Sequence, residues 1–291
     1  MPQFSTESSI AFLGMGLMGT RMSKRLLDAG FTVAVWNRTT SACDEVIAYG
    51  ATVLNLQKIT DYPIIMLCLA DDHAVQAVAD QLMPNLQSGQ IIIDFSSLSV
   101  AKTHALSKQV ANKNVTWIDS PVSGGTVGAE QGSLVIFAGG DATLINALAP
   151  IYAPLSARVT CMGGVGTGQA TKICNQLIVA ANSTLIAEAV ALAQQAGVDA
   201  NLLAPALAGG FADSKPFQIL APRMASQRFE PVQWKVQTLA KDLNNATTLA
   251  KDLGLNIPVA SHALAQLQQH QQNGFAEQDL SSIILNINME I

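Results

Sequence analysis

Short apolar runs alternate with helical patterns over the first half of the chain. The runs predict buried strands at residues 9–13, 31–36, 64–69, 91–95, 115–118, 133–138 and 158–162. Segments with helical periodicity lie between most of them, at residues 20–29, 41–49, 72–83, 100–112 and 141–149. The run 64–69 is apolar throughout, as a parallel strand covered on both faces requires. The pattern therefore predicts a parallel α/β sheet between layers of helices.

The second half of the chain shows helical patterns and no strong strand. Glycines and prolines divide it into predicted helices at residues 169–196, 199–208, 235–253, 258–273 and 278–287. Pro216 and Pro222 count among the predicted breaks. We therefore expect two domains, an α/β domain of residues 1–167 and an all-α domain of residues 168–291.

The first helix of the second half is the longest. Neither glycine nor proline occurs between Gly168 and Gly197, so a helix of about 29 residues, roughly 43 Å long, is possible. A helix of this length usually belongs to two bodies, and we expect it to join the domains. Lys172 and Asn175 share one of its faces. A lysine beside an amide can move a proton to or from a substrate oxygen; the alternative is a solvated lysine near a polar helix start.

A glycine-rich turn follows the first predicted strand and opens the first helix. Its G-x-G-x-x-G spacing, in that context, predicts a dinucleotide-binding loop. The glycines let backbone N–H groups and the positive end of the helix approach a pyrophosphate. The predicted loop consists of Gly14, Met15, Gly16, Leu17, Met18 and Gly19. A plain strand-to-helix turn is the alternative.

The end of the second strand indicates which dinucleotide binds. The residue that reads the ribose is expected about 20 positions after the first glycine, and there Asn37 replaces the usual carboxylate. Arg38 and Thr39 supply a guanidinium and a hydroxyl, which suit a 2′-phosphate. We therefore predict NADP(H) in preference to NAD(H). The alternative is that Arg38 points to solvent.

The carboxyl ends of the predicted strands should line a cleft, because ligands of open α/β sheets bind there. The candidate lining residues are Leu69 and Ala70, Ser96 and Ser97, and residues 119–125. In the last segment Ser123 precedes Gly124 and Gly125, so a hydroxyl and exposed backbone N–H groups can bind a carboxylate. An ordinary turn before a hairpin would look the same.

Composition and charge limit the partners of the protein. A net charge of −5 and the lack of any lysine or arginine run argue against nucleic acid and acidic membranes. Only 13% of residues are charged against 49% hydrophobic, which favours a large core and extensive contact between subunits.

The cysteines, the histidines and the N-terminal residues indicate the metal content and the cellular location. The four cysteines and four histidines show no metal-ligand spacing, so we expect a reduced, metal-free, cytoplasmic protein. The N-terminal residues are polar and lack the basic region of a signal peptide. No uninterrupted apolar run reaches the roughly 18 residues that span a membrane.

Four motifs occur in a characteristic order. They are residues 14–19, residues 119–125, the stretch from Gly166 to Asn175, and the triplet Lys241-Asp242-Leu243. In these motifs nearly the whole chain resembles the β-hydroxyacid dehydrogenase family, which includes 3-hydroxyisobutyrate dehydrogenase, tartronate semialdehyde reductase and glyoxylate/succinic semialdehyde reductase. The resemblance implies a Rossmann-like dinucleotide-binding domain, then an all-helical domain that closes the cleft and forms homodimers or homotetramers.

The resemblance also implies roles for single residues. Lys172 is similar to the catalytic lysine of the family, and Lys241 to the residue that closes onto the cofactor. The expected substrate-binding residues are Ser123, Gly124, Gly125, Asn175 and Asp242. Beyond the glycine loop, the expected cofactor-binding residues are Asn37, Arg38, Thr39, Leu69, Ala70, Ser97 and Lys241. Ala70 departs from the proline of many members, and without the resemblance Lys241 and Asp242 would equally suit a surface break in a helix.

The expected activity is hydride transfer between NADP(H) and a short carboxylic acid, a β-hydroxyacid or its semialdehyde. Two alternatives remain: an NADPH-dependent reductase of imines or larger aldehydes, and a catalytically silent NADP-binding module. The resemblance implies that imine-reducing relatives replace the lysine, so Lys172 speaks against the first alternative.

Overall fold

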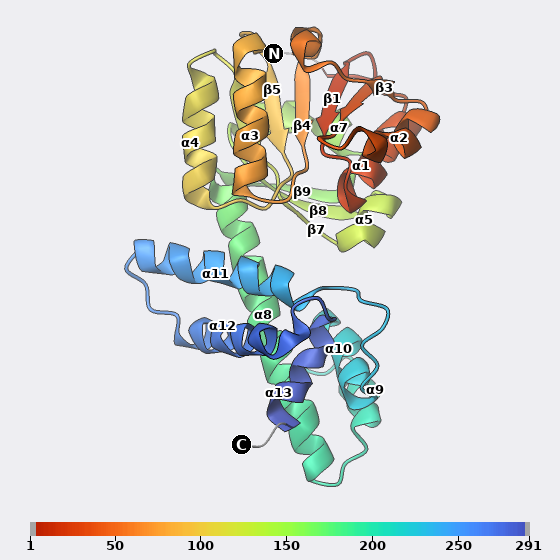
Figure 1. Cartoon of the computed structure of the whole chain (residues 1–291), viewed down its shortest axis with the longest axis vertical. Helices are drawn as coiled ribbons and strands as arrows, with labels where there is room; N and C mark the ends of the chain where they lie inside the picture. Colours follow the sequence, from red (N-terminus) through yellow and green to blue (C-terminus); the bar gives the residue numbers. More distant parts are fainter. Residues whose placement is uncertain (1–3, 289–291) are drawn as a thin grey trace. The chain divides into compact units, whose positions relative to one another are not determined.

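Figure 1 shows the computed structural model of the chain, which describes residues 4–288. The chain divides into two compact units, Met1–Lys172 and Ile173–Ile291. The first unit is α/β. The second is helical over its described residues, apart from an isolated bridge between Lys235 and Asp279. These observations confirm the predicted fold class; the outermost residues of the predicted domains, 1–3 and 289–291, lie outside the described part.

Within residues 4–288, a nine-stranded sheet forms the centre of the first unit. The strands are β1 (Ile10–Leu13), β2 (Val33–Trp36), β3 (Thr52–Val53), β4 (Ile64–Leu67), β5 (Ile91–Asp94), β6 (Thr116–Asp119), β7 (Val122–Ser123), β8 (Leu134–Gly139) and β9 (Ser156–Gly163). Their order is β3-β2-β1-β4-β5-β6-β8-β7, with β9 beside β8. The strands β1 to β6 pair in parallel, and β8 runs antiparallel to β6. The strand order reverses between β1 and β4: β1, β2 and β3 follow one another in one direction across the sheet, and β4, β5 and β6 in the other. Sheets of this kind bind ligands at such a point.

Helices cover both faces of this sheet. They are α1 (Leu17–Asp28), α2 (Asp44–Ala48), α3 (Asp72–Leu82), α4 (Val100–Ala111), α5 (Gly125–Gln131), α6 (Ala142–Ala147) and α7 (Ala149–Tyr152), with short helices η1 (Thr40–Cys43), η2 (Leu56–Asp61) and η3 (Met83–Asn85). Ile10 and Phe12 join one core with residues of α1, whereas Ala11 and Leu13 join the other with residues of α3 and α4. Figure 1 shows α3 and α4 on the same face. Burial on both sides explains why these strands are apolar throughout.

The helix α8 (Thr167–Gln195) has 29 residues, as the spacing of glycines predicted. It begins in the first unit and ends in the second. By length and composition alone it could cross a membrane, although 39% of its most apolar window is buried within the protein. The sequence expectation concerned uninterrupted apolar runs, and polar residues such as Asn182 and Glu188 do interrupt this helix, although its mean hydropathy remains high.

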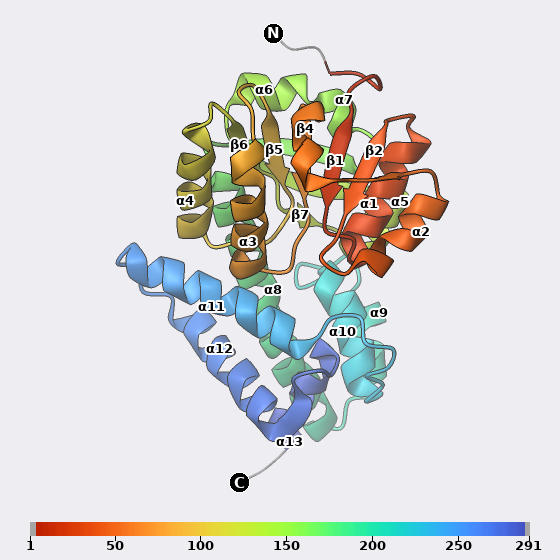
Figure 2. The same ribbon diagram turned by 45° about the horizontal axis from the view of Figure 1, so that its top comes forward.

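The second unit continues with helices that are mostly short. They are η4 (Ala200–Leu202), α9 (Leu203–Leu207), α10 (Lys215–Ala225), α11 (Val236–Asp252), α12 (Pro258–His270), η5 (Gln271–Phe275), η6 (Leu280–Ile284) and α13 (Leu285–Asn288). The helices α11 and α12 pack along each other (Figure 2).

The helix α10 corrects the sequence interpretation, which treated its two prolines as breaks. Pro216 lies in the first turn, where a missing N–H has no helical acceptor to lose, and Ser214 caps that turn by accepting from Phe217 N. Pro222 lies inside the helix. Its cost is offset by the buried side chains Phe217, Leu220 and Met224 on one face.

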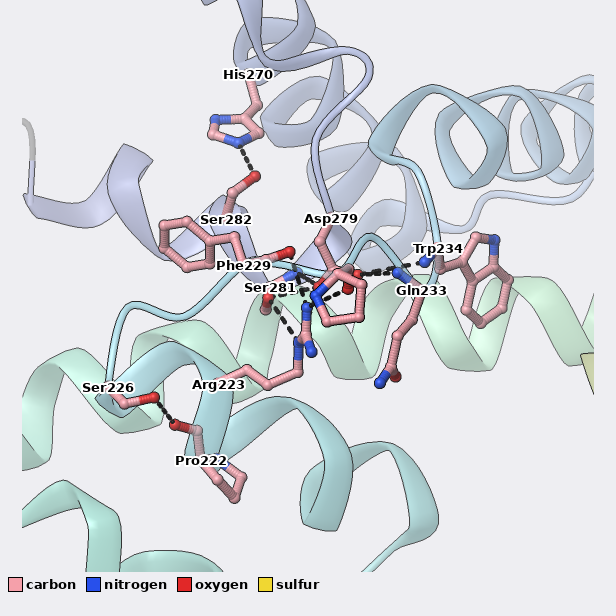
Figure 3. A network of polar contacts seen from close by, with 11 residues as sticks. Pro222, Arg223, Ser226, Phe229, Gln233, Trp234, His270, Asp279, Ser281 and Ser282 are labelled. Atoms are coloured by element: carbon pink, nitrogen blue, oxygen red, sulfur yellow. Dashed lines mark hydrogen bonds and ion pairs between the residues drawn. The ribbon is translucent and has the colours of Figure 1, made fainter.

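A buried ion pair fixes the loop between α10 and α11 (Figure 3). Arg223 Nε lies 3.3 Å from Asp279 Oδ1, and Arg223 also donates to the carbonyl oxygens of Phe229 (2.8 Å) and Pro231 (2.9 Å). Asp279 Oδ2 accepts from Gln233 N at 2.7 Å. Burial alone would raise the pKa of Asp279, but hydrogen bonds from neighbouring hydroxyl and N–H groups hold it below its ordinary value. This pairing positions the chain that leads into α11.

Candidate functional site

The glycine loop lies at the point where the strand order reverses. Gly14 has φ +109°, and a Cβ there would stand 2.2 Å from Cys68 O at the end of β4. A Cβ on Gly19 would stand 1.9 Å from Gly14 O. Only glycine fits either position, so these two residues let α1 approach the sheet closely.

The start of α1 is prepared for an anion. Gly16 is its N-cap, no side chain caps the helix, and its first turn contains no acidic residue. A Cβ on Gly16 would meet nothing within 4 Å, so space adjoins the backbone at this point. Uncapped N–H groups and the helix dipole together favour a phosphate group. The loop therefore fits the pyrophosphate of a dinucleotide.

Asn37 connects the glycine loop to the end of β2. Its Oδ1 accepts from Met15 N (3.1 Å), and its Nδ2 donates to Thr39 O (2.9 Å). The side chain thus connects the glycine loop with the loop after β2 by hydrogen bonds to backbone groups. Arg38 and Thr39, the next two residues, are exposed at the same end of the strand. The structure therefore brings together the glycine loop and the three predicted selector residues.

Leu69 and Ala70 follow β4, and Ser96 and Ser97 follow β5. Leu69 N donates to Ser96 Oγ at 2.9 Å, which ties the two strand ends together. Ala70 is exposed and Ser97 half-buried. These predicted lining residues thus lie at the carboxyl edge of the sheet, next to the reversal point.

Asp94, the last residue of β5, is a buried carboxyl group that the sequence interpretation did not single out. Its Oδ1 accepts from Ser96 N at 2.9 Å, while its Oδ2 is buried without a hydrogen-bond partner in the described structure. Burial raises the pKa of Asp94 to about 7, and the charges of Asp119 and Asp72 add to this effect. Only its place at the end of an apolar strand hinted at an unusual carboxyl group.

Residues 119–125 leave the sheet at the end of β6. Ser123 lies in β7, which pairs antiparallel with β8. Gly124 (φ +126°) and Gly125 (φ +63°) then open α5, with Gly124 as its N-cap. Both glycines are exposed. The strands β7 and β8 pair antiparallel, but the helix α5 lies between them in the chain, so they do not form a simple hairpin.

The predicted residues of α8 and α11 form a chain of polar contacts within the second unit. Asn175 Nδ2 donates to Gln176 Oε1 (2.8 Å), and Gln176 Nε2 donates to Asp242 Oδ2 (2.5 Å). Lys241 Nζ lies 3.5 Å from Asp242 Oδ1. Asp242 is buried, whereas Lys241 is exposed. Gln176 connects the two helices. In the sequence it is marked only by its position four residues after Lys172, which places both on one helix face.

Lys172 lies five residues after the start of α8, in the first unit. Its side chain is half-buried. Asn175 follows one turn later, so both belong to one helix face. Among residues 4–288, no group of three or more His, Cys, Asp or Glu side chains could hold a metal ion.

A sheet whose first six strands are parallel, with a close glycine turn and an uncapped helix at the point where the strand order reverses, is typical of dinucleotide-binding proteins. Residues 9–164 match the family model of the NAD binding domain of 6-phosphogluconate dehydrogenase. Residues 166–287 match that of the NAD-binding domain of NADP-dependent 3-hydroxyisobutyrate dehydrogenase. The chain belongs to the β-hydroxyacid dehydrogenase family of NAD(P)-dependent oxidoreductases.

Single relatives agree with this assignment. The chain is 33% identical to 2-hydroxy-3-oxopropionate reductase of Escherichia coli, over 94% of this chain and 95% of the relative. It is 30% identical to glyoxylate/succinic semialdehyde reductase 2, chloroplastic, of Arabidopsis thaliana, over 95% and 78%. The solved structure of 3-hydroxyisobutyrate dehydrogenase of Mycobacterium tuberculosis with L-serine superposes with a TM-score of 0.89 at 26% identity, covering 97% of this chain and 99% of that one.

Proposed function

We propose that the protein transfers a hydride between NADP(H) and a short β-hydroxyacid or its semialdehyde, of the 3-hydroxyisobutyrate, glyoxylate or succinic semialdehyde type. The observation that carries this proposal is the pair Lys172 and Asn175 on one face of α8, directly after the glycine-rich turn. The names of the relatives describe reductases and dehydrogenases of such acids.

Lys172 is the proposed acid and base. In reduction its ammonium group gives a proton to the carbonyl oxygen, and in oxidation its amine takes the hydroxyl proton. Asn175 orients the same oxygen, with its amide held by Gln176. When bound, the nicotinamide supplies or accepts the hydride.

Ser123, Gly124 and Gly125 are the proposed carboxylate site. Exposed N–H groups at the start of α5 and the Ser123 hydroxyl can donate to a carboxylate without a buried cation. Binding of the carboxylate would fix the reacting carbon relative to the cofactor. The reaction then takes place within one complex and is effectively unimolecular. Asp242, which accepts from Gln176 Nε2, is proposed as a further substrate-binding residue.

The cofactor site is proposed to prefer NADP(H). The glycine loop would hold the pyrophosphate, and Arg38 and Thr39 the 2′-phosphate. Leu69, Ala70 and Ser97 would line the nicotinamide end, and Lys241 would contact the bound cofactor from α11.

A substrate panel tests the proposal. NADPH and, separately, NADH absorbance would be followed with glyoxylate, succinic semialdehyde, tartronate semialdehyde and methylmalonate semialdehyde, and the reverse reaction with 3-hydroxyisobutyrate. Turnover with NADPH well above NADH supports the proposal and identifies the substrate type. Turnover only with imines or long aldehydes, or none despite tight NADPH binding, contradicts it.

We also propose that the protein is a cytoplasmic homodimer or homotetramer without nucleic-acid or membrane partners. Ile178, Leu185 and Leu192 recur at intervals of seven residues along α8 and are 58%, 62% and 71% exposed. Such an apolar stripe on a helix is suited to a matching surface on a second copy.

A further inference from the structure

The turn before α8 is bound by a carboxylate from a distant strand. Asp119, at the end of β6, is fully buried. Its Oδ1 accepts from Gly166 N (2.7 Å) and its Oδ2 from Gln169 N (2.8 Å). A Cβ on Gly168 would stand 2.8 Å from Oδ2, and one on Gly139 would stand 2.5 Å from Oδ1. The glycines therefore make room for this carboxylate.

This carboxylate takes the place of a local helix cap. The first N–H groups of a helix have no helical acceptor and usually bind a side chain just before the helix. Gly163, Gly164 and Gly166 offer no such side chain, and the hydroxyl of Thr167 donates to Gly164 O instead of accepting. The start of α8 is thus held by the sheet itself.

Gln169 makes a second connection, to the loop after β5. Its side chain is fully buried. Its Oε1 accepts from Leu98 N (3.1 Å), and its Nε2 donates to Ser96 O (2.7 Å). Two side chains therefore fix the first turn of α8 to the carboxyl ends of two neighbouring strands.

We propose that Asp119 and Gln169 are positioning residues for Lys172. Gln169 and Lys172 lie three residues apart on one helix, so the orientation of the first turn determines where the lysine stands relative to the sheet edge. This inference rests on the proposed function, because it assumes that Lys172 moves the proton. Neither Asp119 nor Gln169 is proposed to contact the reacting atoms.

The central test compares two buried glutamines. Gln169→Leu removes both side-chain hydrogen bonds at the start of α8. Gln90→Leu is the matched control. Gln90 is also buried and donates to Ile59 O (2.7 Å) and Tyr62 O (2.8 Å), but it precedes β5 and so lies at the amino ends of the strands. Both variants should be less stable. We expect kcat to fall about 10- to 100-fold in Gln169→Leu alone, a larger factor than any rise in the Kd for NADPH.

A second variant covers the case in which Gln169→Leu does not fold. Gln169→Met has a side chain of similar length and no charge but loses both hydrogen bonds, so its kcat should fall about as far as that of Gln169→Leu. Equal kcat in Gln169→Met, Gln90→Leu and the wild type would overturn the proposal.

A double-mutant cycle shows whether the effect passes through the lysine. In a Lys172→Ala background the Gln169 substitutions should change residual turnover less than twofold, because the group they position is gone. The same fold-loss in both backgrounds would overturn the positioning role while leaving the proposed function intact. Full turnover of Lys172→Ala itself would instead overturn the proposed function.

Discussion

Arg38 is the residue on which cofactor choice depends in this account. We predict that Arg38→Ala raises the KM for NADPH about 10- to 100-fold, since a hydrogen bond to a charged group contributes about 1.5–3 kcal/mol. The KM for NADH should change little. Steady-state kinetics with both cofactors measures this, with Arg158→Ala, an exposed arginine on β9, as the control. Equal effects on both cofactors would contradict the selector role.

Asp94 gives a pH prediction. Its pKa rises from 3.8 to about 7 on folding, so the folded state prefers the protonated form. The wild type should therefore lose stability as the pH rises between these two values, by up to about 1.4 kcal/mol per pH unit. Asp94→Asn cannot ionise, and its stability relative to the wild type should increase from pH 5 to pH 7.

Urea unfolding at several pH values would measure this difference. The control is Asp80→Asn, because Asp80 is an exposed carboxylate whose pKa its glutamine partners lower. Parallel pH profiles for Asp94→Asn and the wild type would show that Asp94 is ionised in the folded protein at low pH.

At the scale of single residues, the sequence predicted where residues lie better than which groups they contact. Asn37, Arg38 and Thr39 lie beside the glycine loop, as the motif implied. Nothing in the sequence indicated that Asn37 binds Met15 N, or that Gln176 connects Asn175 with Asp242. Such contacts join residues far apart in the chain, and spacing rules describe only near neighbours.

At the scale of elements, the ion pair of Arg223 and Asp279 should hold the loop before α11. Their side chains are 15% and 2% exposed. Asp279→Ala leaves Arg223 without its carboxylate partner and Gln233 N without its acceptor, so we predict a loss of about 3–5 kcal/mol in the free energy of unfolding.

Urea denaturation would measure this loss. The matched control is Glu277→Ala, which removes an exposed partner of Lys235 and should leave the free energy of unfolding nearly unchanged. A similar small loss in both variants would contradict the structural role of the buried pair.

Seven of the nine strands of the described residues and the long helix followed directly from the sequence, whereas the two-residue strands β3 and β7 and the helix α10 did not. An apolar run or an interval without glycine and proline reports a regular element by itself. The prolines of α10 suggested breaks, but Pro216 suits a first turn and burial of one face compensates for Pro222. Tertiary packing decided that helix, and packing is not visible in a local pattern.

At the scale of the whole molecule, the stripe on α8 predicts association. Light scattering should report a dimer or tetramer, and Leu185→Glu should shift it toward smaller species by placing a charge on the apolar surface. Ile219→Glu, on α10, is the control for an exposed apolar residue outside the stripe. A monomeric wild type would contradict the proposed assembly.

The order of the four motifs predicted the family through its resemblance, and three of them also open a helix: residues 14–19 open α1, residues 119–125 open α5 and residues 166–175 open α8. The tie between β6 and the start of α8 was not predictable. It depends on a buried carboxylate meeting backbone N–H groups 47 and 50 positions later.

The most direct test of this account is the turnover of Lys172→Ala with NADPH and the best semialdehyde of the panel. We predict a fall in kcat of about 100- to 10,000-fold, the usual contribution of general acid–base catalysis, with an unchanged Kd for NADPH. Turnover equal to that of the wild type would contradict the assignment of Lys172 as the group that moves the proton.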